Sequence, residues 1–264
     1  MNQPHRDQKL EGLLQTALDE GRNVWAVGDI HGCRQTFEEL LAKLRLSEED
    51  QVVCLGDLID RGPDSDGVLR IVRDCGNIHS LKGNHEEIMS RAIGSPSGRT
   101  MEFWLRIGGR ETLESMSTDS SKRLGRASEW LSFTNSLPTE VVLDTFRLVH
   151  AGYDPASSPD DQSDKERLSS RTIFLAQTPL DPARQIVCGH TPVQKLVDFG
   201  LPSVEEGVWT SDIQLDDGRP SVLLIDTGAV LESGAINPRL TAYNLYTGKI
   251  KEVPRHQCSA PIKE

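Results

Sequence analysis

Cysteine pairs, long apolar runs and an apolar leader are all missing from this sequence. Its five cysteines are odd in number and none lies in a C-x-x-C pair, so we expect no disulfide framework and a reducing compartment. No stretch approaches the roughly 18 apolar residues of a membrane-spanning helix, and residues 1–23 are polar, unlike a secretory signal. These absences predict a cytoplasmic protein with no membrane partner.

Positive charge is scarce as well. The chain carries 29 basic residues against 40 acidic ones, which gives a formal net charge of −11. Nucleic acids and anionic membranes are bound by lysines and arginines that neutralise phosphate groups, so neither is expected as a partner. An anionic ligand would instead need a local positive site, built from metal ions or from a few placed arginines.

The remaining composition is that of a globular protein. Hydrophobic and charged residues make up 36% and 26% of the chain, and a length of 264 residues fits one large domain spanning 1–264. Short apolar runs alternate with helical patterns, which indicates an α/β fold. Helices are expected at 8–20, 35–44 and 65–75, and within 86–137 with breaks at 94–98 and 115–121. Strands are expected at 24–27, 51–55, 77–81, 141–143, 146–149, 186–188 and 222–225, and a surface loop at 153–169.

The apolar runs share one feature where they end: a glycine or another small residue stands beside an Asp, Asn or His. In open α/β sheets, the ligand site forms at the carboxyl ends of the strands. Asp29 and Asp57 are 28 residues apart, and Asp57 and Asn84 are 27 apart, close to the roughly 30-residue length of a β-α-β unit. We therefore expect these polar groups to meet at one edge of a sheet.

The polar groups at these strand ends are suited to metal ions. They are Asp29, His31, Asp57, Asn84, His150 and His190. Carboxylate, amide and imidazole ligands suit Mn, Fe, Zn or similar ions, and six of them are too many for one tetrahedral ion. Two ions about 3.5–4 Å apart can share a carboxylate, activate water and bind a phosphoryl group. The sequence therefore predicts a site for two divalent ions, with Mn²⁺ expected and Fe or Zn as alternatives.

Taken singly, these residues have plainer explanations. The aspartates could cap helices, Asn84 could be a turn residue, and a lone histidine is more often structural. All of these explanations would have to hold at every strand end at once, which argues against them. Trp104 and Trp130, in the helical segment, are interpreted as core residues, with a substrate-facing role as the alternative.

Five short motifs, in order along the chain, carry a family resemblance. They are Gly-Asp-Ile-His-Gly at 28–32, Gly-Asp-Leu-Ile-Asp-Arg-Gly at 56–62, Gly-Asn-His-Glu at 83–86, His-Ala-Gly at 150–152 and Gly-His-Thr at 189–191. Together they resemble the signatures of the phosphoprotein phosphatase family of calcineurin-like metallophosphoesterases, of the bacterial serine/threonine phosphatase type. Further likeness continues through 104–116, around Arg171 and at 226–229, so the resemblance covers about residues 23–248.

The resemblance implies a two-sheet β-sandwich flanked by helices. It also implies a family core at about 23–248, which follows the N-terminal helix of 1–22 that the apolar spacing predicts, and a helical insert at about 87–137 that forms a partial lid near the active site.

The same resemblance implies a role for each site residue. Asp29 and His31 would hold one metal ion, Asp57 would bridge, and the second ion would be held by Asn84, His150 and His190. A metal-bridging hydroxide would attack the phosphorus atom in line. The leaving oxygen would receive its proton from His85, which Asp60 would hold and keep basic.

The substrate phosphate would be bound by Arg61, Arg171 and Asn84, since guanidinium groups match phosphate oxygens. Two departures concern this part of the pattern. Ser169 stands where the family has Trp two residues before the arginine, and Val230 and Leu231 stand where a Tyr is often found.

Three functions remain in competition. The first is a phosphatase acting on phosphorylated proteins or peptides at serine or threonine, with phosphotyrosine and small phosphate esters as further substrates. The second is a symmetrical dinucleoside tetraphosphate hydrolase. Those relatives tend to carry Ala at the position of Asp60 and Asp at that of Glu86, so this sequence favours the phosphatase. The third is an inactive metal-binding scaffold, although none of the expected ligands is lost here.

Overall fold

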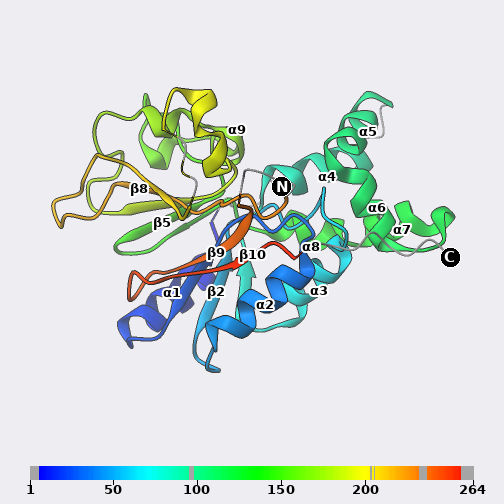
Figure 1. Cartoon of the computed structure of the whole chain (residues 1–264), viewed down its shortest axis with the longest axis horizontal. Coiled ribbons are helices and arrows are strands. Elements are labelled where there is room, and N and C mark those ends of the chain that lie inside the picture. The colour runs from blue at the N-terminus through cyan, green and yellow to red at the C-terminus, as the bar shows by residue number, and fades with distance from the viewer. Residues whose placement is uncertain (1–5, 95–97, 203, 205, 232–236, 257–264) are drawn as a thin grey trace.

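Two mixed β-sheets form the centre of the molecule (Figure 1). The computed structural model describes residues 6–94, 98–202, 204, 206–231 and 237–256. The first sheet has the order β10-β9-β1-β2-β3 and the second has the order β4-β5-β6-β8-β7. The strands of the first sheet are β1 (Val24–Val27), β2 (Gln51–Cys54), β3 (Ile78–Ser80), β9 (Arg239–Asn244) and β10 (Ile250–Pro254). Those of the second are β4 (Glu140–Val142), β5 (Phe146–Val149), β6 (Gln185–Cys188), β7 (Trp209–Thr210) and β8 (Val222–Leu224). The expected two-sheet α/β architecture is confirmed.

Each sheet contains a run of three parallel strands, at one end of the first sheet and in the centre of the second. In the first sheet, β1, β2 and β3 are parallel, and β9 and β10 extend the edge in antiparallel pairing. In the second, β5, β6 and β8 are parallel, and β4 and β7 close the two edges as antiparallel partners. Because parallel strands end on the same side, each sheet presents three carboxyl ends at one edge.

Both faces of each sheet are packed, because successive apolar side chains of a strand point to opposite faces. Val24 and Ala26 of β1 point into the core between the sheets, where they meet side chains such as Leu148 of β5. Trp25 and Val27 point to the opposite face. Side chains of a strand alternate between faces, so a strand with both faces covered is apolar along its whole length.

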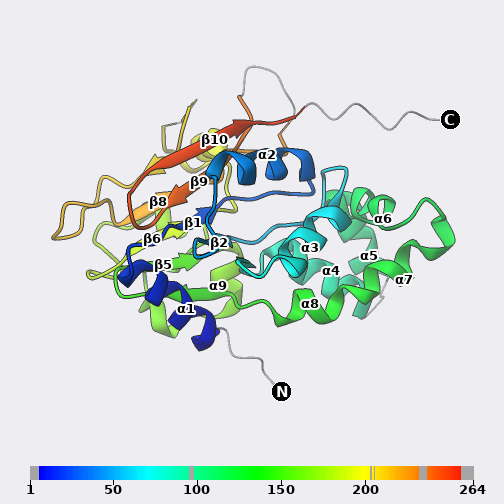
Figure 2. The same cartoon turned by 90° about the horizontal axis from the view of Figure 1, so that it is seen from below.

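Helices cover the outer face of the first sheet (Figure 2). They are α2 (Arg34–Leu44) and α3 (Ser65–Asp74), whose leucines and valines pack on the outward side chains of β1 and β2. Helix α1 (Gln8–Asp19) instead inserts Leu10, Leu14 and Ala17 into the core between the sheets. The outer face of the second sheet is covered by the short 3-10 segments η4 (Thr172–Leu175) and η5 (Val193–Phe199).

The segment between β3 and β4 consists of helices and extends from one end of the sandwich (Figure 1). It contains α4 (Asn84–Gly94), α5 (Gly98–Trp104), the π-helical turn η1 (Leu105–Gly109), α6 (Arg110–Met116), η2 (Ser120–Lys122), α7 (Arg123–Glu129) and α8 (Leu131–Ser136). Residues 95–97, in the expected break at 94–98, lie outside the described residues. In the described part of the chain, no helix has the length and apolarity needed to cross a membrane.

The expected loop at 153–169 is wrong for most of residues 159–169. Residues there form η3 (Pro159–Asp161) and α9 (Asp164–Ser169). Ser163 and Glu166 form a capping box at the start of α9, and Arg167 in this helix donates to the buried Glu140 at 3.1 Å. The Ser-x-x-Glu pattern was a sufficient helix signal, masked by the surrounding Asp, Ser and Pro.

Candidate active site

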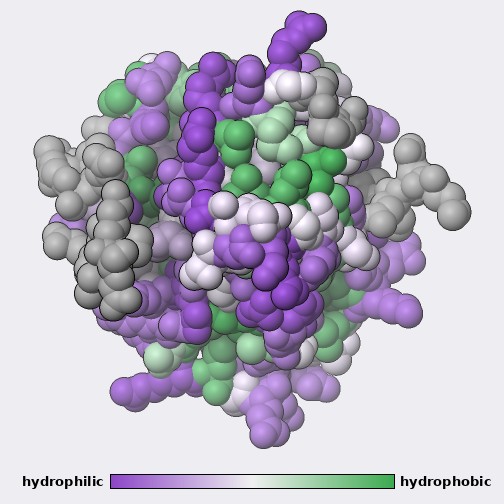
Figure 3. All heavy atoms as spheres, turned by 90° about the vertical axis from the view of Figure 1, so that its right-hand side faces the viewer, coloured by the Kyte–Doolittle hydropathy of each residue, from purple (hydrophilic) through white to green (hydrophobic). Residues whose placement is uncertain are grey.

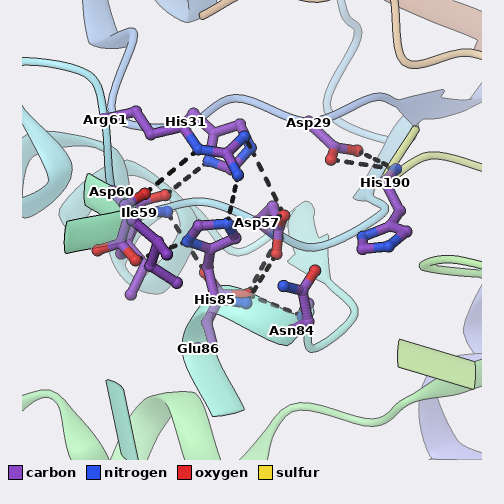
Figure 4. Close-up of polar contacts among 12 residues, drawn as sticks. Asp29, His31, Asp57, Ile59, Asp60, Arg61, Asn84, His85, Glu86 and His190 are labelled. Carbon is purple, nitrogen blue, oxygen red and sulfur yellow. Dashed lines mark hydrogen bonds and ion pairs between the residues drawn. The ribbon is translucent and has the colours of Figure 1, made fainter. Parts of the chain in front are cut away.

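The carboxyl ends of the two parallel strand triplets face a common centre (Figure 4). Asp29 and His31 follow β1, and Asp57, Asp60 and Arg61 follow β2. Asn84 and His85 begin α4 after β3, whereas His150 follows β5 and His190 follows β6. Most of these side chains are almost completely buried; His85 and His150, for example, are 1% and 0% exposed. All six expected ligands are therefore contributed by strand ends of both sheets.

Asp57 lies at the centre of this group. Its Oδ2 is 3.5 Å from His31 Nε2 and 3.9 Å from His85 Nε2, whereas its Oδ1 is 3.4 Å from His150 Nε2. Oδ1 also accepts the backbone N–H of His85 at 3.0 Å. Each carboxylate oxygen thus faces different histidines, the arrangement needed to link two ions.

Two histidines are oriented by backbone carbonyls. His31 Nδ1 donates to Ile59 O at 2.9 Å, and His150 Nδ1 donates to Leu55 O at 2.8 Å. Burial lowers the pKa of both imidazoles, which favours their neutral forms, and with Nδ1 as the donor the lone pair of each ring lies on Nε2, the atom that faces Asp57. A hydrogen bond on the other ring nitrogen is how proteins fix a metal-ligating histidine.

The third histidine carries the clearest sign of a missing partner. His190 Nε2 is buried and has no hydrogen-bond partner. On the other side of the ring, His190 Nδ1 lies 3.2 Å from His150 Nε2, which is itself 2.9 Å from Asn84 Oδ1. Burial lowers the pKa of His190 well below its usual value. At least one ring nitrogen of His190 is thus left without a partner next to the oxygen of Asn84 and the ring of His150, and a bound cation would supply that partner.

Metal-ligand spacing is met twice within the described residues. Ligand atoms of His31, Asp57 and His85 lie within 4.8 Å of one another, and so do those of Asp57, His150 and His190. The two groups share Asp57. The donor set of carboxylate and imidazole therefore fits a pair of divalent ions.

Asp29 is beside these two groups. Both of its carboxylate oxygens accept the backbone N–H of His190, at 2.9 and 3.1 Å. Burial, together with the nearby Asp226 and Asp57, raises the pKa of Asp29 well above its usual value. A crowded, buried carboxylate of this kind is stabilised in its charged form by a bound cation.

Close approach of the backbone to these carboxylates requires glycine at two positions. A Cβ on Gly83 would overlap Asp57 Oδ1, and a Cβ on Gly189 would overlap Asp29 Oδ1. Any other residue at these positions would displace the carboxylates from the strand ends.

His85 is paired with a carboxylate that has no access to solvent. Its Nδ1 lies 2.6 Å from Asp60 Oδ2, and Asp60 is 0% exposed. Burial alone would lower the pKa of His85, but the Asp57 and Asp60 carboxylates raise it above its usual value. The two carboxylates thus favour the protonated imidazole, whose Nε2 is directed at the centre of the site, an arrangement suited to giving a proton to a leaving group.

The Asp60 carboxylate is itself positioned by the helical segment. The Trp104 indole N–H lies 3.1 Å from both carboxylate oxygens, and Thr112 Oγ1 donates to Oδ1 at 2.6 Å. The alternative that Trp104 faces the substrate is therefore wrong, because the ring is fully buried and its N–H is directed at Asp60. The likeness at 104–116 was the only sequence signal for these contacts, and no periodicity would reveal them.

Two arginines face the site. The exposed Arg61 donates to His31 Nε2 at 2.9 Å, and its second terminal nitrogen lies 2.8 Å from His85 Nε2 (Figure 4). Arg171 is half-buried, with its guanidinium 5.8 Å from the Phe199 ring centroid and within electrostatic reach of Asp57 and Asp29. Neither arginine forms an ion pair with a carboxylate in the described part of the chain, so both guanidinium groups are available to an anion.

Backbone strain is concentrated at this site. Among described residues other than glycine, positive φ angles occur at His31, Arg45, Asp57, Asp60, Arg61 and His190. Five of these six line the site, with φ between 46° and 74°. Residues with side chains avoid this region, at a cost of about 1–3 kcal/mol each, and tend to adopt it at functional sites.

Glu86 is a residue whose role the sequence did not reveal. Its buried carboxylate accepts the backbone N–H groups of Asp57, Leu58, Ile59 and Gly83, at 2.8 to 3.3 Å. Burial first, and then the neighbouring Asp57, raises the pKa of Glu86 to about 7. Glu86 therefore connects the loop after β2 to the start of α4, which brings Asp57 and His85 together.

Comparison with known proteins agrees with this geometry. The sequence pattern of the calcineurin-like phosphoesterase family matches residues 22–224. Serine/threonine-protein phosphatase 1 of Salmonella typhimurium is 30% identical over 187 residues, which cover 67% of this chain and 82% of the relative. A symmetrical bis(5'-nucleosyl)-tetraphosphatase of Delftia acidovorans is 33% identical over 101 residues, covering 31% of this chain and 36% of the relative.

A similar fold occurs among solved structures. A crystal structure of a protein provisionally assigned as a diadenosine tetraphosphatase superimposes with a TM-score of 0.60 at 23% identity. The match covers 90% of this chain and 95% of that protein. At this identity, the likeness concerns the fold alone.

Proposed function

The chain belongs to the calcineurin-like phosphoesterase family of metal-dependent hydrolases, and we propose that it is a phosphoprotein phosphatase. In this proposal it acts in the cytoplasm on phosphoserine and phosphothreonine in proteins or peptides, with phosphotyrosine and small phosphate esters as further substrates. The S. typhimurium relative named as a serine/threonine-protein phosphatase supports this choice, since it is matched over 82% of its length.

The observation that carries the proposal is the pairing of His85 with Asp60. A serine or threonine alkoxide is a strongly basic leaving group, so its departure depends on a proton donor. His85 Nδ1 lies 2.6 Å from the Asp60 carboxylate, which Trp104 and Thr112 hold in place. A nucleoside polyphosphate leaves as a weakly basic anion and has less need of such a donor.

The other site residues have corresponding roles. Asp57, His31 and Asp29 would hold one divalent ion, and Asp57, Asn84, His150 and His190 the other, with Mn²⁺ as the proposed metal. Bound ions of this kind activate water and neutralise phosphate charge. Arg61 and Arg171, helped by Asn84, bind the phosphate oxygens, and His85 donates its Nε2 proton to the leaving oxygen.

Hydrolysis of symmetrical dinucleoside tetraphosphates is the second candidate. The D. acidovorans relative with that name favours it, although the match covers only 36% of that protein. The buried Asp60 argues against it, because the acid that this carboxylate supports is of little use to a phosphate leaving group.

A substrate panel tests the proposal. The protein is stripped with a chelator and reloaded with Mn²⁺, and phosphate release is timed from phosphoserine, phosphothreonine and phosphotyrosine peptides beside diadenosine tetraphosphate. We expect peptide turnover that requires metal and is abolished by Asp57→Asn. Turnover of the dinucleotide alone would establish the second candidate, and no turnover of any substrate would point to a metal-binding scaffold.

A further inference from the structure

A groove begins at Arg61 and continues over the helical segment. It has a volume of about 1050 Å³ and is lined mainly by α5, η1 and α6, with Val230 and Arg255 on its far side. Its charged lining residues are Arg61, Arg99, Glu102, Arg106, Arg110, Glu111 and Arg255. Five arginines against two glutamates make the groove electropositive, whereas the whole chain has a net charge of −11.

The arginines of this groove differ from those on the rest of the surface. Most other arginines form an ion pair with Asp or Glu; Arg34, Arg70 and Arg126, for example, do so at 2.7 to 3.1 Å. In the described part of the chain, the arginines with no such pair are Arg45, Arg61, Arg99, Arg106, Arg110, Arg171 and Arg255. All except Arg45 line either the active site or this groove. Guanidinium groups that have no carboxylate partner and are gathered along one groove indicate a ligand that supplies carboxylates or phosphates.

The groove is continuous with the phosphate-binding site. Arg61 contributes to both, because its guanidinium lies 2.9 Å from His31 Nε2 and 2.8 Å from His85 Nε2 in the site, and its backbone N–H donates to Gly108 O at 3.1 Å. Figure 3, which views this end of the molecule, shows hydrophilic side chains over much of the exposed face. A ligand whose phosphate lies at Arg61 would therefore extend past Arg106 and Arg110.

We infer that this groove selects phosphopeptides with Asp or Glu residues beside the phosphorylated residue. The inference rests on the proposed phosphatase function. A peptide is favoured over a nucleotide because a base would find a single aromatic ring among the described lining residues. That ring, Phe103, is 44% exposed and has the Arg106 guanidinium 5.6 Å from its centroid, whereas the lining offers five guanidinium groups to carboxylates. Side-chain carboxylates along an extended peptide match a row of separate guanidinium groups.

The test compares two phosphoserine peptides that differ only in their flanking residues, which are Glu in one and Gln in the other. We expect the protein to hydrolyse the Glu peptide with the higher kcat/KM, and the preference to shrink as salt rises, because exposed charge pairs are screened. The triple variant R99Q/R106Q/R110Q should lose roughly tenfold in kcat/KM on the Glu peptide, about a few-fold per exposed pair.

Two controls accompany the variant. The variant R45Q/R70Q/R126Q removes the same charge from exposed positions outside the groove and should keep the preference. Turnover of p-nitrophenyl phosphate, which is too small to reach Arg99 or Arg106, should be unchanged in both triple variants and shows that they are folded.

The outcomes separate this inference from the proposed function. Equal kcat/KM on the Glu and Gln peptides would overturn the inference and leave the phosphatase function intact. Loss of the preference in both triple variants would also overturn it, because the groove would then have no special role. Turnover of diadenosine tetraphosphate without any peptide turnover would overturn the proposed function together with the inference.

Discussion

The Asp60 carboxylate illustrates how one residue controls the chemistry of another. It lies 2.6 Å from His85 Nδ1 and contributes, with Asp57, to the raised pKa of His85. A general acid is active while protonated, so a raised pKa extends activity to higher pH, and activity falls as pH rises through that pKa.

Replacing Asp60 tests this relation. Asp60→Asn should lower kcat on a phosphoserine peptide by roughly 100-fold, within the usual contribution of general acid catalysis. The alkaline limb of the pH–rate profile should move to lower pH, because the variant loses a carboxylate that raises the pKa of His85. Turnover of p-nitrophenyl phosphate, whose leaving group needs little protonation, should fall far less. An equal fall on both substrates would show that Asp60 serves binding or folding instead.

Trp104 acts on the pair of Asp60 and His85 indirectly, through its contact with Asp60. Trp104→Phe keeps the buried ring and removes the indole N–H that lies 3.1 Å from both Asp60 oxygens. Since a hydrogen bond to a charged group is worth about 1.5–3 kcal/mol and only part of it should appear in kcat, we expect a loss of about fivefold.

The matched control for this change is Trp130→Phe. Trp130 belongs to the same helical segment, and its indole N–H donates at 2.9 Å to Asp66, which is outside the site. The kcat of the Trp130→Phe variant should equal that of the unchanged protein. Similar losses in the two variants would mean that Trp104 acts through the stability of the segment rather than through Asp60.

The residues of the candidate site could be predicted from the sequence, because the types of their side chains and their order along the chain indicate their chemistry. Asp29, Asp57 and Asn84 each follow a strand, and the structure brings them to one centre as expected. The left-handed backbone conformation at Asp57, Asp60 and His190 could not be predicted, because residues other than glycine rarely adopt it and no local sequence pattern requires it.

At the scale of elements, the strands that were predicted best are short, mostly apolar runs. The predicted ranges 24–27 and 146–149 coincide with β1 and β5. The strands β7, β9 and β10 were missed, since two of them are edge strands with polar, half-exposed residues and β9 mixes Arg, Thr and Asn with its apolar residues. Their identity depends on pairing with distant partners, which no local pattern contains.

The connection between β2 and α4 is an element-scale feature that stability measurements can test. Glu86→Gln replaces a carboxylate oxygen that accepts backbone N–H groups with an amide NH₂ that cannot accept them. We expect the free energy of unfolding to fall by about 1–3 kcal/mol, the usual cost of an unsatisfied buried donor. Urea unfolding of the metal-free protein would measure it.

Glu87→Gln is the natural comparison, because Glu87 is adjacent in α4 but pairs at the surface with Lys82 and Arg91. This change should cost less than about 0.5 kcal/mol. Equal effects of the two substitutions would indicate that the bonds of Glu86 to the loop contribute little.

At the scale of the whole molecule, the ligands come from both sheets. Asp29, His31 and Asp57 follow strands of the first sheet, whereas His150 and His190 follow strands of the second. Ions bound here would connect the two halves of the sandwich, and their binding energy would add to the stability of the fold.

Metal removal should therefore lower the melting temperature. At a free Mn²⁺ concentration about 100 times its Kd, binding should stabilise the folded protein by about 2.7 kcal/mol relative to the chelated form. Scanning calorimetry with and without Mn²⁺ would measure the shift, with Asp57→Asn as the variant in which the shift should be much smaller. A melting temperature that does not respond to Mn²⁺ would contradict a metal site between the sheets.

The position of β9 has a consequence for how the protein is made. Strand β1, which leads to Asp29 and His31, pairs with β2 on one side and with β9 on the other, through Trp25 and Asn244 among others. A ribosome synthesises β1 and β2 early, but β9 only near residue 244. Until then, one edge of the apolar strand β1, with its unpaired backbone N–H and C=O groups, remains open on the nascent chain. The first half of the site is therefore translated long before the strand that encloses it, and a chaperone that shields open strand edges would have its longest opportunity during this interval.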